Sequence, residues 1–180
     1  MATVAALAAA MLAGGCATHG AETDATPKAA GTASVRGLGE VAKLRAIGGS
    51  AVTGKVRVVD RGDGATITIL AYNVPIGDYR ITINRDANCS SPNGFSAGPA
   101  WAPPASQRAP AELVGVLTAT ESGSAQATVH VRGLRATGPD GVAGHSVVLY
   151  AGRKVTAARP DIPNEIFACG VFEPTQVLDF

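Results

Sequence analysis

The stretch Gly77–Asn84, which reads GDYRITIN, alternates apolar and polar side chains with a period of two residues. Successive side chains of a strand point to opposite faces. Ile81 and Ile83 would therefore lie on one face of an extended strand, and Thr82 and Asn84 on the other. This pattern predicts a half-buried β-strand with one face on a hydrophobic core.

The same period recurs on both sides of this stretch, and turn-forming sequences such as RGDG at residues 61–64 separate the runs. We expect eight strands in an all-β fold, arranged as an antiparallel Greek-key barrel or sandwich. Residues 85–110 and 153–164 lack a strand pattern and predict long loops, which in a compact β domain are usually functional. The runs that we can place cover residues 52–59, 66–71, 79–84, 113–120, 125–131, 146–151 and 166–172.

The composition suits one globular domain and gives no case for nucleic-acid binding. The chain has 180 residues, with 15 Lys and Arg against 14 Asp and Glu, so its formal net charge is only +1. We expect residues 36–180 to form the domain, because about 145 residues can bury one core. Three cysteines and three histidines are the residues whose chemistry needs explaining.

The N-terminus predicts export and a lipid anchor. Residues 4–12 are apolar and uncharged, and they are followed by LAGGC, which ends at Cys16. Nine residues are too few to cross a bilayer, so residues 1–16 are interpreted as a signal peptide. The cysteine after small residues resembles a bacterial lipobox, which implies lipidation of Cys16 and a place in the bacterial cell envelope, in the periplasm at the outer membrane. The alternative is an ordinary secretory signal with a chance cysteine.

Residues 17–35 are rich in Ala, Thr and Gly and have no hydrophobic period, which predicts a flexible tether between the membrane and the domain. His19 lies in this tether, and we expect it to be solvated.

The domain resembles the copper–zinc superoxide dismutases in their bacterial periplasmic form, from about residue 41 to residue 172. GDYRITIN is similar to the family's strand Gly-x-His-Gly-Phe-His-Val-His, and the other matching segments follow in the family's order. These are CSSPNG at 89–94, SAGPAWAP at 96–103, SVVLYAG at 146–152 and FACGVF at 167–172. The resemblance implies the barrel fold and a disulfide between Cys89 and Cys169, which an exported chain can form.

The resemblance also implies that the metal ligands are gone. Family members bind copper through four histidines, and zinc through three histidines and an aspartate, one histidine being shared. The four copper positions hold Thr82, Asn84, Ala100 and Tyr150.

The zinc ligands and the arginine that attracts superoxide are replaced as well. The zinc loop at residues 104–113 has no His or Asp, and Leu113, beside Glu112, falls near the zinc aspartate. Ile166 stands where the family has its arginine.

These replacements predict that no copper or zinc cofactor is bound and that no catalytic residue remains. Copper redox chemistry needs several imidazoles in a fixed arrangement. Threonine and asparagine are weak neutral ligands, alanine has no ligand atom, and tyrosine would have to lose a proton with a pKa near 10. His130 and His145 lie at other positions, and we expect both to be surface or satisfied histidines.

We therefore expect an envelope lipoprotein domain with a binding or structural role. Thr82, Asn84, Trp101 and Tyr150 would form a shallow polar recognition patch for a protein or glycan partner, or a surface filled by the loops, which is the plainer interpretation. The sequence leaves open whether the chain forms a homodimer.

Two alternatives remain. One is a superoxide dismutase, which converts superoxide to hydrogen peroxide and oxygen, with metal ligands at other positions of the chain or supplied by partners. The other is a weak copper-handling module that uses His19, His145 or Tyr150.

Overall fold

The computed structural model describes residues 39–152 and 165–174. These residues lie in one compact unit, Val35–Phe180. The expected signal peptide with Cys16, the tether at 17–35 and the loop at 153–164 lie outside the described residues.

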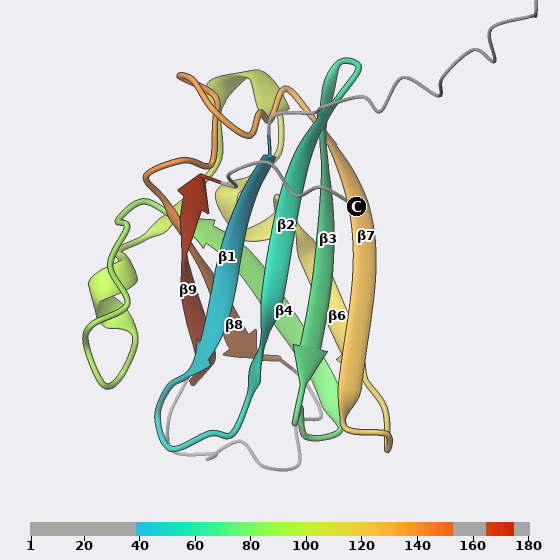
Figure 1. Ribbon diagram of the computed structural model, residues 1–180, viewed down its shortest axis with the longest axis vertical. Coiled ribbons are helices and arrows are strands. Elements are labelled where there is room, and N and C mark those ends of the chain that lie inside the picture. Colours follow the sequence, from blue (N-terminus) through green and yellow to red (C-terminus); the bar gives the residue numbers. More distant parts are fainter. Residues whose placement is uncertain (1–38, 153–164, 175–180) are drawn as a thin grey trace, which may run out of the picture. The chain divides into compact units, whose positions relative to one another are not determined.

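The described residues form an antiparallel all-β domain of nine strands and three short 3-10 turns (Figure 1). The all-β fold predicted from the sequence is confirmed. The strands are β1 (Gly39–Ala46), β2 (Thr53–Arg61), β3 (Gly64–Tyr72), β4 (Gly77–Asn84), β5 (Ala100–Trp101), β6 (Gly115–Ala119), β7 (Ser124–Arg132), β8 (Ser146–Ala151) and β9 (Ile166–Pro174). The turns are η1 (Phe95–Ala97), η2 (Pro104–Ser106) and η3 (Pro110–Glu112).

The strands make one curled sheet with two sides. Strands β1, β2, β3 and β7 pair in that order on one side, and β4 pairs with β5, β6 and β8 on the other. Strand β9 pairs with both β1 and β8 and so joins the two sides. On the edge of the sheet away from β9, strand β6 lies beside β7. Apart from the two-residue strand β5, strands β4, β6 and β7 follow one another in the chain, and β3 lies beside β7, which is a Greek-key order.

Three elements differ from the sequence prediction. Strand β1 was missed, because its buried positions hold Glu40, Ala42 and Leu44, of which only one is a large apolar residue. Strand β5 lies within the expected loop at 85–110 and is too short to show a period. Strand β6 begins at Gly115 instead of residue 113, because η3 ends just before it and Gly115 has a φ of 107°.

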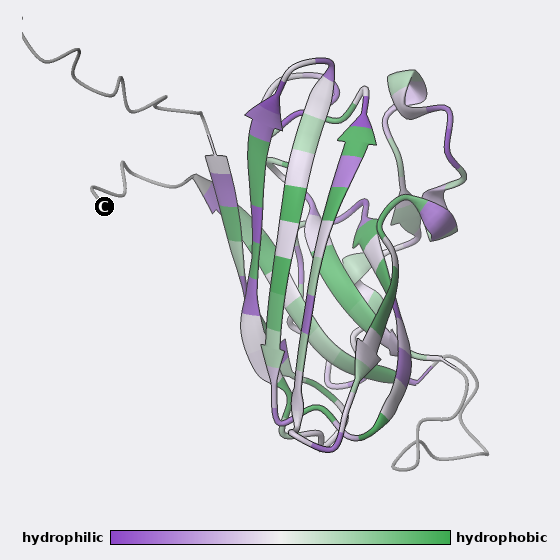
Figure 2. Ribbon diagram, turned by 90° about the vertical axis from the view of Figure 1, so that its right-hand side faces the viewer, coloured by the Kyte–Doolittle hydropathy of each residue, from purple (hydrophilic) through white to green (hydrophobic). Residues whose placement is uncertain are grey.

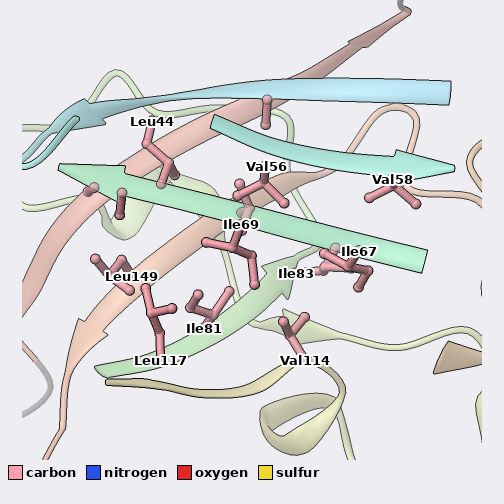
Figure 3. Packing of buried hydrophobic residues seen from close by; sticks show 14 of the residues in the cluster. Leu44, Val56, Val58, Ile67, Ile69, Ile81, Ile83, Val114, Leu117 and Leu149 are labelled. Carbon is pink, nitrogen blue, oxygen red and sulfur yellow. The ribbon is translucent and has the colours of Figure 1, made fainter. Parts of the chain in front are cut away.

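The core lies between the two sides of the sheet, where alternate side chains from each strand meet (Figure 3). Ile67 and Ile69 of β3 contribute from one side, and Ile81 and Ile83 of β4 from the other. Tyr79 is fully buried, and its hydroxyl donates a hydrogen bond to the Pro75 carbonyl at 2.8 Å. Burial raises the pKa of Tyr79 to about 12.

A second, smaller cluster holds the long loop against the outer side of β8 and β9. Ala97, Val148, Ile166 and Cys169 are buried together there. Cys89 of the loop forms a disulfide with Cys169 of β9, with the Cα atoms 5.7 Å apart. The pairing implied by the family resemblance is therefore present in the structure.

Glu40 is a charged residue that is buried at the boundary of the core. Its side chain points inward from β1 and is 1 % exposed. Its Oε2 atom has no hydrogen-bond partner among the described residues. Burial raises the pKa of the Glu40 carboxyl above its ordinary value, because the charged form loses its hydration.

Removing the disulfide should lower the free energy of unfolding by about 4 kcal/mol, because the cross-link closes a long loop in the unfolded chain. The two cysteines are 80 residues apart in sequence. Urea unfolding of the wild type and of the Cys89→Ala/Cys169→Ala variant, each with and without reductant, measures this. A reductant effect that persists in the double variant would contradict the assignment.

Replacing Glu40 with Gln should raise the free energy of unfolding at pH 7 by about 1 kcal/mol, because a buried charge is removed. The raised folded-state pKa means that the cost is absent below the ordinary pKa of 4.5 and grows as the pH rises above it. Urea unfolding at pH 7 and pH 4 should show a gain that disappears at pH 4. Glu121→Gln, at an exposed turn position, is the control and should change neither value.

Candidate recognition site

The outer face of β4 presents Arg80, Thr82 and Asn84, because Tyr79, Ile81 and Ile83 point into the core. Tyr150 of β8 pairs in register with Arg80, and Ala100 of β5 pairs with Asn84. The register therefore brings together the four residues that the family resemblance of the sequence aligns with copper ligands. All four come from three neighbouring strands.

Three of these residues are joined by hydrogen bonds. The Thr82 hydroxyl donates to Asn84 Oδ1 at 2.6 Å. The Asn84 amide donates from Nδ2 to the Gly98 carbonyl at 2.7 Å and to the Tyr150 hydroxyl at 3.2 Å. The polar atoms of Thr82 and Asn84 are thus used within the protein, and the carbonyl of a covering loop completes the network.

The loop that covers this network depends on a glycine. Gly98 has a φ of 71°, and a Cβ atom there would lie 2.1 Å from Asp86 Oδ2. A residue with a Cβ atom would be strained at this φ, and the Asp86 side chain would have to move aside. The backbone also holds the loop, since the Asp86 amide donates to the Ala97 carbonyl at 3.0 Å.

The expected shallow polar patch needs correction. Thr82 is 1 % exposed and Asn84 is fully buried, whereas Tyr150 and Trp101 are only partly buried. The sequence showed that Thr82 and Asn84 leave the core side of β4, but the loop and β5 then cover them. The network fills space between the strands and the loop.

Trp101 is separated from the network. Successive residues of β5 point to opposite sides, so Ala100 faces Thr82 and Tyr150 while Trp101 packs against the main core. The indole stacks on the His145 ring, with centroids 3.9 Å apart and planes at 22°. His145 Nδ1 lies 2.9 Å from the Arg85 carbonyl, to which it donates a hydrogen bond. Nδ1 therefore carries a proton and is used in this hydrogen bond.

His130 lies on the far side of the sheet, where its Nε2 is 3.0 Å from Asp63 Oδ1. Arg132 binds the other oxygen of Asp63 at 3.0 Å. The hydrogen bond from His130 is the main reason that the pKa of Asp63 is lowered. This exposed group is separate from the candidate site.

An open pocket of about 310 Å³ lies beside the buried network. The Arg80 guanidinium carbon is 4.9 Å from the centroid of the Tyr150 ring, and Phe95 at the rim is 66 % exposed. The pocket therefore offers a cation, a phenol and an exposed aromatic ring. Its lining consists of Arg80, Thr82, Phe95, Ala100, Ala111 and Tyr150.

Sequence reasoning missed Arg80 and Phe95 as site residues. Arg80 could have been found, because it shares the two-residue period of Thr82 and Asn84. Phe95 could not, because its position depends on how the long loop folds.

A second cavity of about 370 Å³ adjoins the loop after β1 and includes Gly48, Asn73 and Phe167.

The residues present do not fit a copper–zinc centre. Asn84 Oδ1 and Nδ2 are already hydrogen-bonded, and Ala100 has no ligand atom. Leu113, near the zinc aspartate position, is fully buried in the core, and Glu112 beside it is exposed. Ile166, at the arginine position, is buried in the second cluster. Within residues 39–152 and 165–174, no three His, Cys, Asp or Glu side chains are grouped to hold a metal.

Comparison with known proteins shows the fold and no more. No family model and no curated protein matches the chain. Among solved structures, the crystal structure of the clock protein EA4 matches with a TM-score of 0.59 and 18 % identity, covering 77 % of this chain and 96 % of that chain. Among the described residues there is no helix long and apolar enough to span a membrane.

Replacing Asn84 with Ala should lower the free energy of unfolding by about 2 kcal/mol, because the Gly98 carbonyl and the Thr82 hydroxyl lose a buried partner. Urea unfolding measures the change. Thr118→Ala is the matched control, since it removes an exposed hydrogen bond to Asp78 of 2.9 Å. We expect the control to cost less than about 0.5 kcal/mol. Equal losses in both variants would show that the buried network adds no more stability than an exposed hydrogen bond.

Proposed function

We propose that this chain is a superoxide-dismutase-like lipoprotein domain of the bacterial envelope that has lost its copper and zinc ligands and acts without catalysis, by binding. The observation that carries the proposal is the hydrogen-bonded set of Thr82, Asn84 and Tyr150 at three of the four copper positions. Because the polar atoms of these side chains form hydrogen bonds with one another, few lone pairs are left to ligate a metal ion. The family resemblance of the flanking segments supplies the rest.

The pocket beside this network is the surface that we propose for a partner. Arg80 and Tyr150 form a cation–π pair at its base, and Phe95 adds an exposed ring at its rim. Tyrosine and arginine are common at the centres of protein interfaces. A protein or glycan with an acidic or hydroxyl group beside an apolar face matches this lining.

Metal content and dismutase activity test the proposal on one purified sample. The oxidised full-length chain should retain neither copper nor zinc after reconstitution and dialysis, and should show no superoxide dismutase activity. One equivalent of copper with cyanide-sensitive activity would establish a dismutase. Micromolar copper binding that is lost in His145→Ala would instead establish a copper-handling module.

A variant with restored ligands is the matched control. Thr82→His, Asn84→His, Ala100→His and Tyr150→His together place four imidazoles at the copper positions. We expect this variant to bind copper where the wild type does not, because the register already brings the four positions together. Copper binding in this variant alone assigns the loss to these side chains.

A further inference from the structure

The outer faces of β1 and β2 carry five cationic side chains, of which Arg61 lies at the end of β2 and the other four are grouped in the middle of the two strands. In both strands the alternate residues point into the core, with Ala42 and Leu44 on β1 and Val56 and Val58 on β2. The residues between them point away from the core. The resulting basic stripe consists of Lys43, Arg45, Lys55 and Arg57.

The centre of the basic stripe places like charges opposite each other. Lys43 pairs in register with Lys55 across the two strands. Like charges at directly opposed positions destabilise a sheet. Neither lysine forms an ion pair with any other described residue. An anion placed between these two side chains would relieve their repulsion.

The basic stripe is a local feature, since the whole chain has a formal net charge of only +1. Glu173 of β9 flanks it, opposite Val41. Strands lie about 4.8 Å apart and alternate side chains follow every 7 Å or so, so the four cations span about 14 Å on a gently curved sheet. Figure 2 faces β3 and β7, and green bands of hydrophobic residues alternate along β3 with nearly white bands of residues of intermediate hydropathy. An extended surface of this kind suits an array of phosphates better than one small ion.

We propose that the basic stripe docks the domain onto an anionic phospholipid surface. The inference rests on the proposed lipid anchor at Cys16. The chain between Cys16 and Gly39 has about 23 residues, which reach at most about 80 Å even when fully extended. An anchored domain therefore stays close to the membrane, where a weak attraction by a few cations is enough to hold it.

A second copy of the chain fits this face poorly. A two-fold contact through the basic stripe would bring Lys43 and Lys55 of one chain against the cations of the other. Headgroup phosphates have the opposite charge and lie in an extended layer. The charge pattern thus favours lipid over a homodimer at this surface.

Cosedimentation with vesicles tests the proposal on the full-length chain carrying Cys16→Ser, which cannot be acylated. At low salt the protein should bind vesicles of equal parts phosphatidylglycerol and phosphatidylcholine, and not vesicles of phosphatidylcholine alone. Binding should weaken as salt is added. Lys43→Gln with Lys55→Gln should bind about 30-fold more weakly, because each basic residue near the surface contributes about five-fold.

The control variant is Arg85→Gln with Arg108→Gln, which removes the same charge at exposed positions outside β1 and β2. It should keep most of the vesicle binding. The Lys43/Lys55 variant should unfold at the same or a higher urea concentration than the parent, which separates lost binding from lost folding. Equal binding to both vesicle types, or equal losses in both double variants, would overturn the proposal.

Two further measurements show whether the lipid proposal or the proposed anchor at Cys16 is wrong. Retention on a heparin column without vesicle binding would assign the basic stripe to an anionic polymer and overturn the lipid proposal. The mass of the wild-type protein from the membrane fraction reports acylation of Cys16. An unmodified Cys16 would refute the anchor in the proposed function, while the vesicle assay still decides what the basic stripe binds.

Discussion

Burial of the inner strand faces is the interaction on which the other features depend. Ile81 and Ile83 of β4 pack against the opposite side of the barrel, and this fixes which residues of β4 face outward. Thr82 and Asn84 are on the outer face because a strand has a period of two, and a slip of one residue would exchange the two sets. The candidate site is thus positioned by the packing of residues that take no part in it.

The outer faces of the two sides of the barrel differ in burial and in charge. On the β4 and β8 side, a long loop held by the disulfide covers the sheet, so polar residues there can be buried and hydrogen-bonded. On the β1 and β2 side, charged residues point outward, and like charges stand opposite each other. One side has the chemistry of a packed interior with a pocket beside it, and the other has the chemistry of an electrostatic contact surface.

Much of the fold was predictable, because alternation and turn residues are local signals. Strands such as β3 and β4 have apolar residues at every second position, whereas β1 places Glu40 and Ala42 on its inner side and gave no such signal. The cysteine pair could be inferred from the family resemblance and is present. The burial of Thr82 and Asn84 was not predictable, because it depends on how the loop after β4 folds back over the strand, and that loop has no periodic pattern.

The sequence by itself determined the strand periodicity, the all-β class and which side chains of β4 lie on its outer face. Those properties depend on residue type and on local spacing, which a chain carries before it folds. Only the tertiary structure decided that Thr82, Asn84 and Tyr150 bond to one another, that Trp101 turns away to stack on His145, and that Arg80 meets Phe95 at a pocket. Apart from the Thr82–Asn84 hydrogen bond, these contacts join different strands or a strand and a loop, which strand register and loop closure bring together.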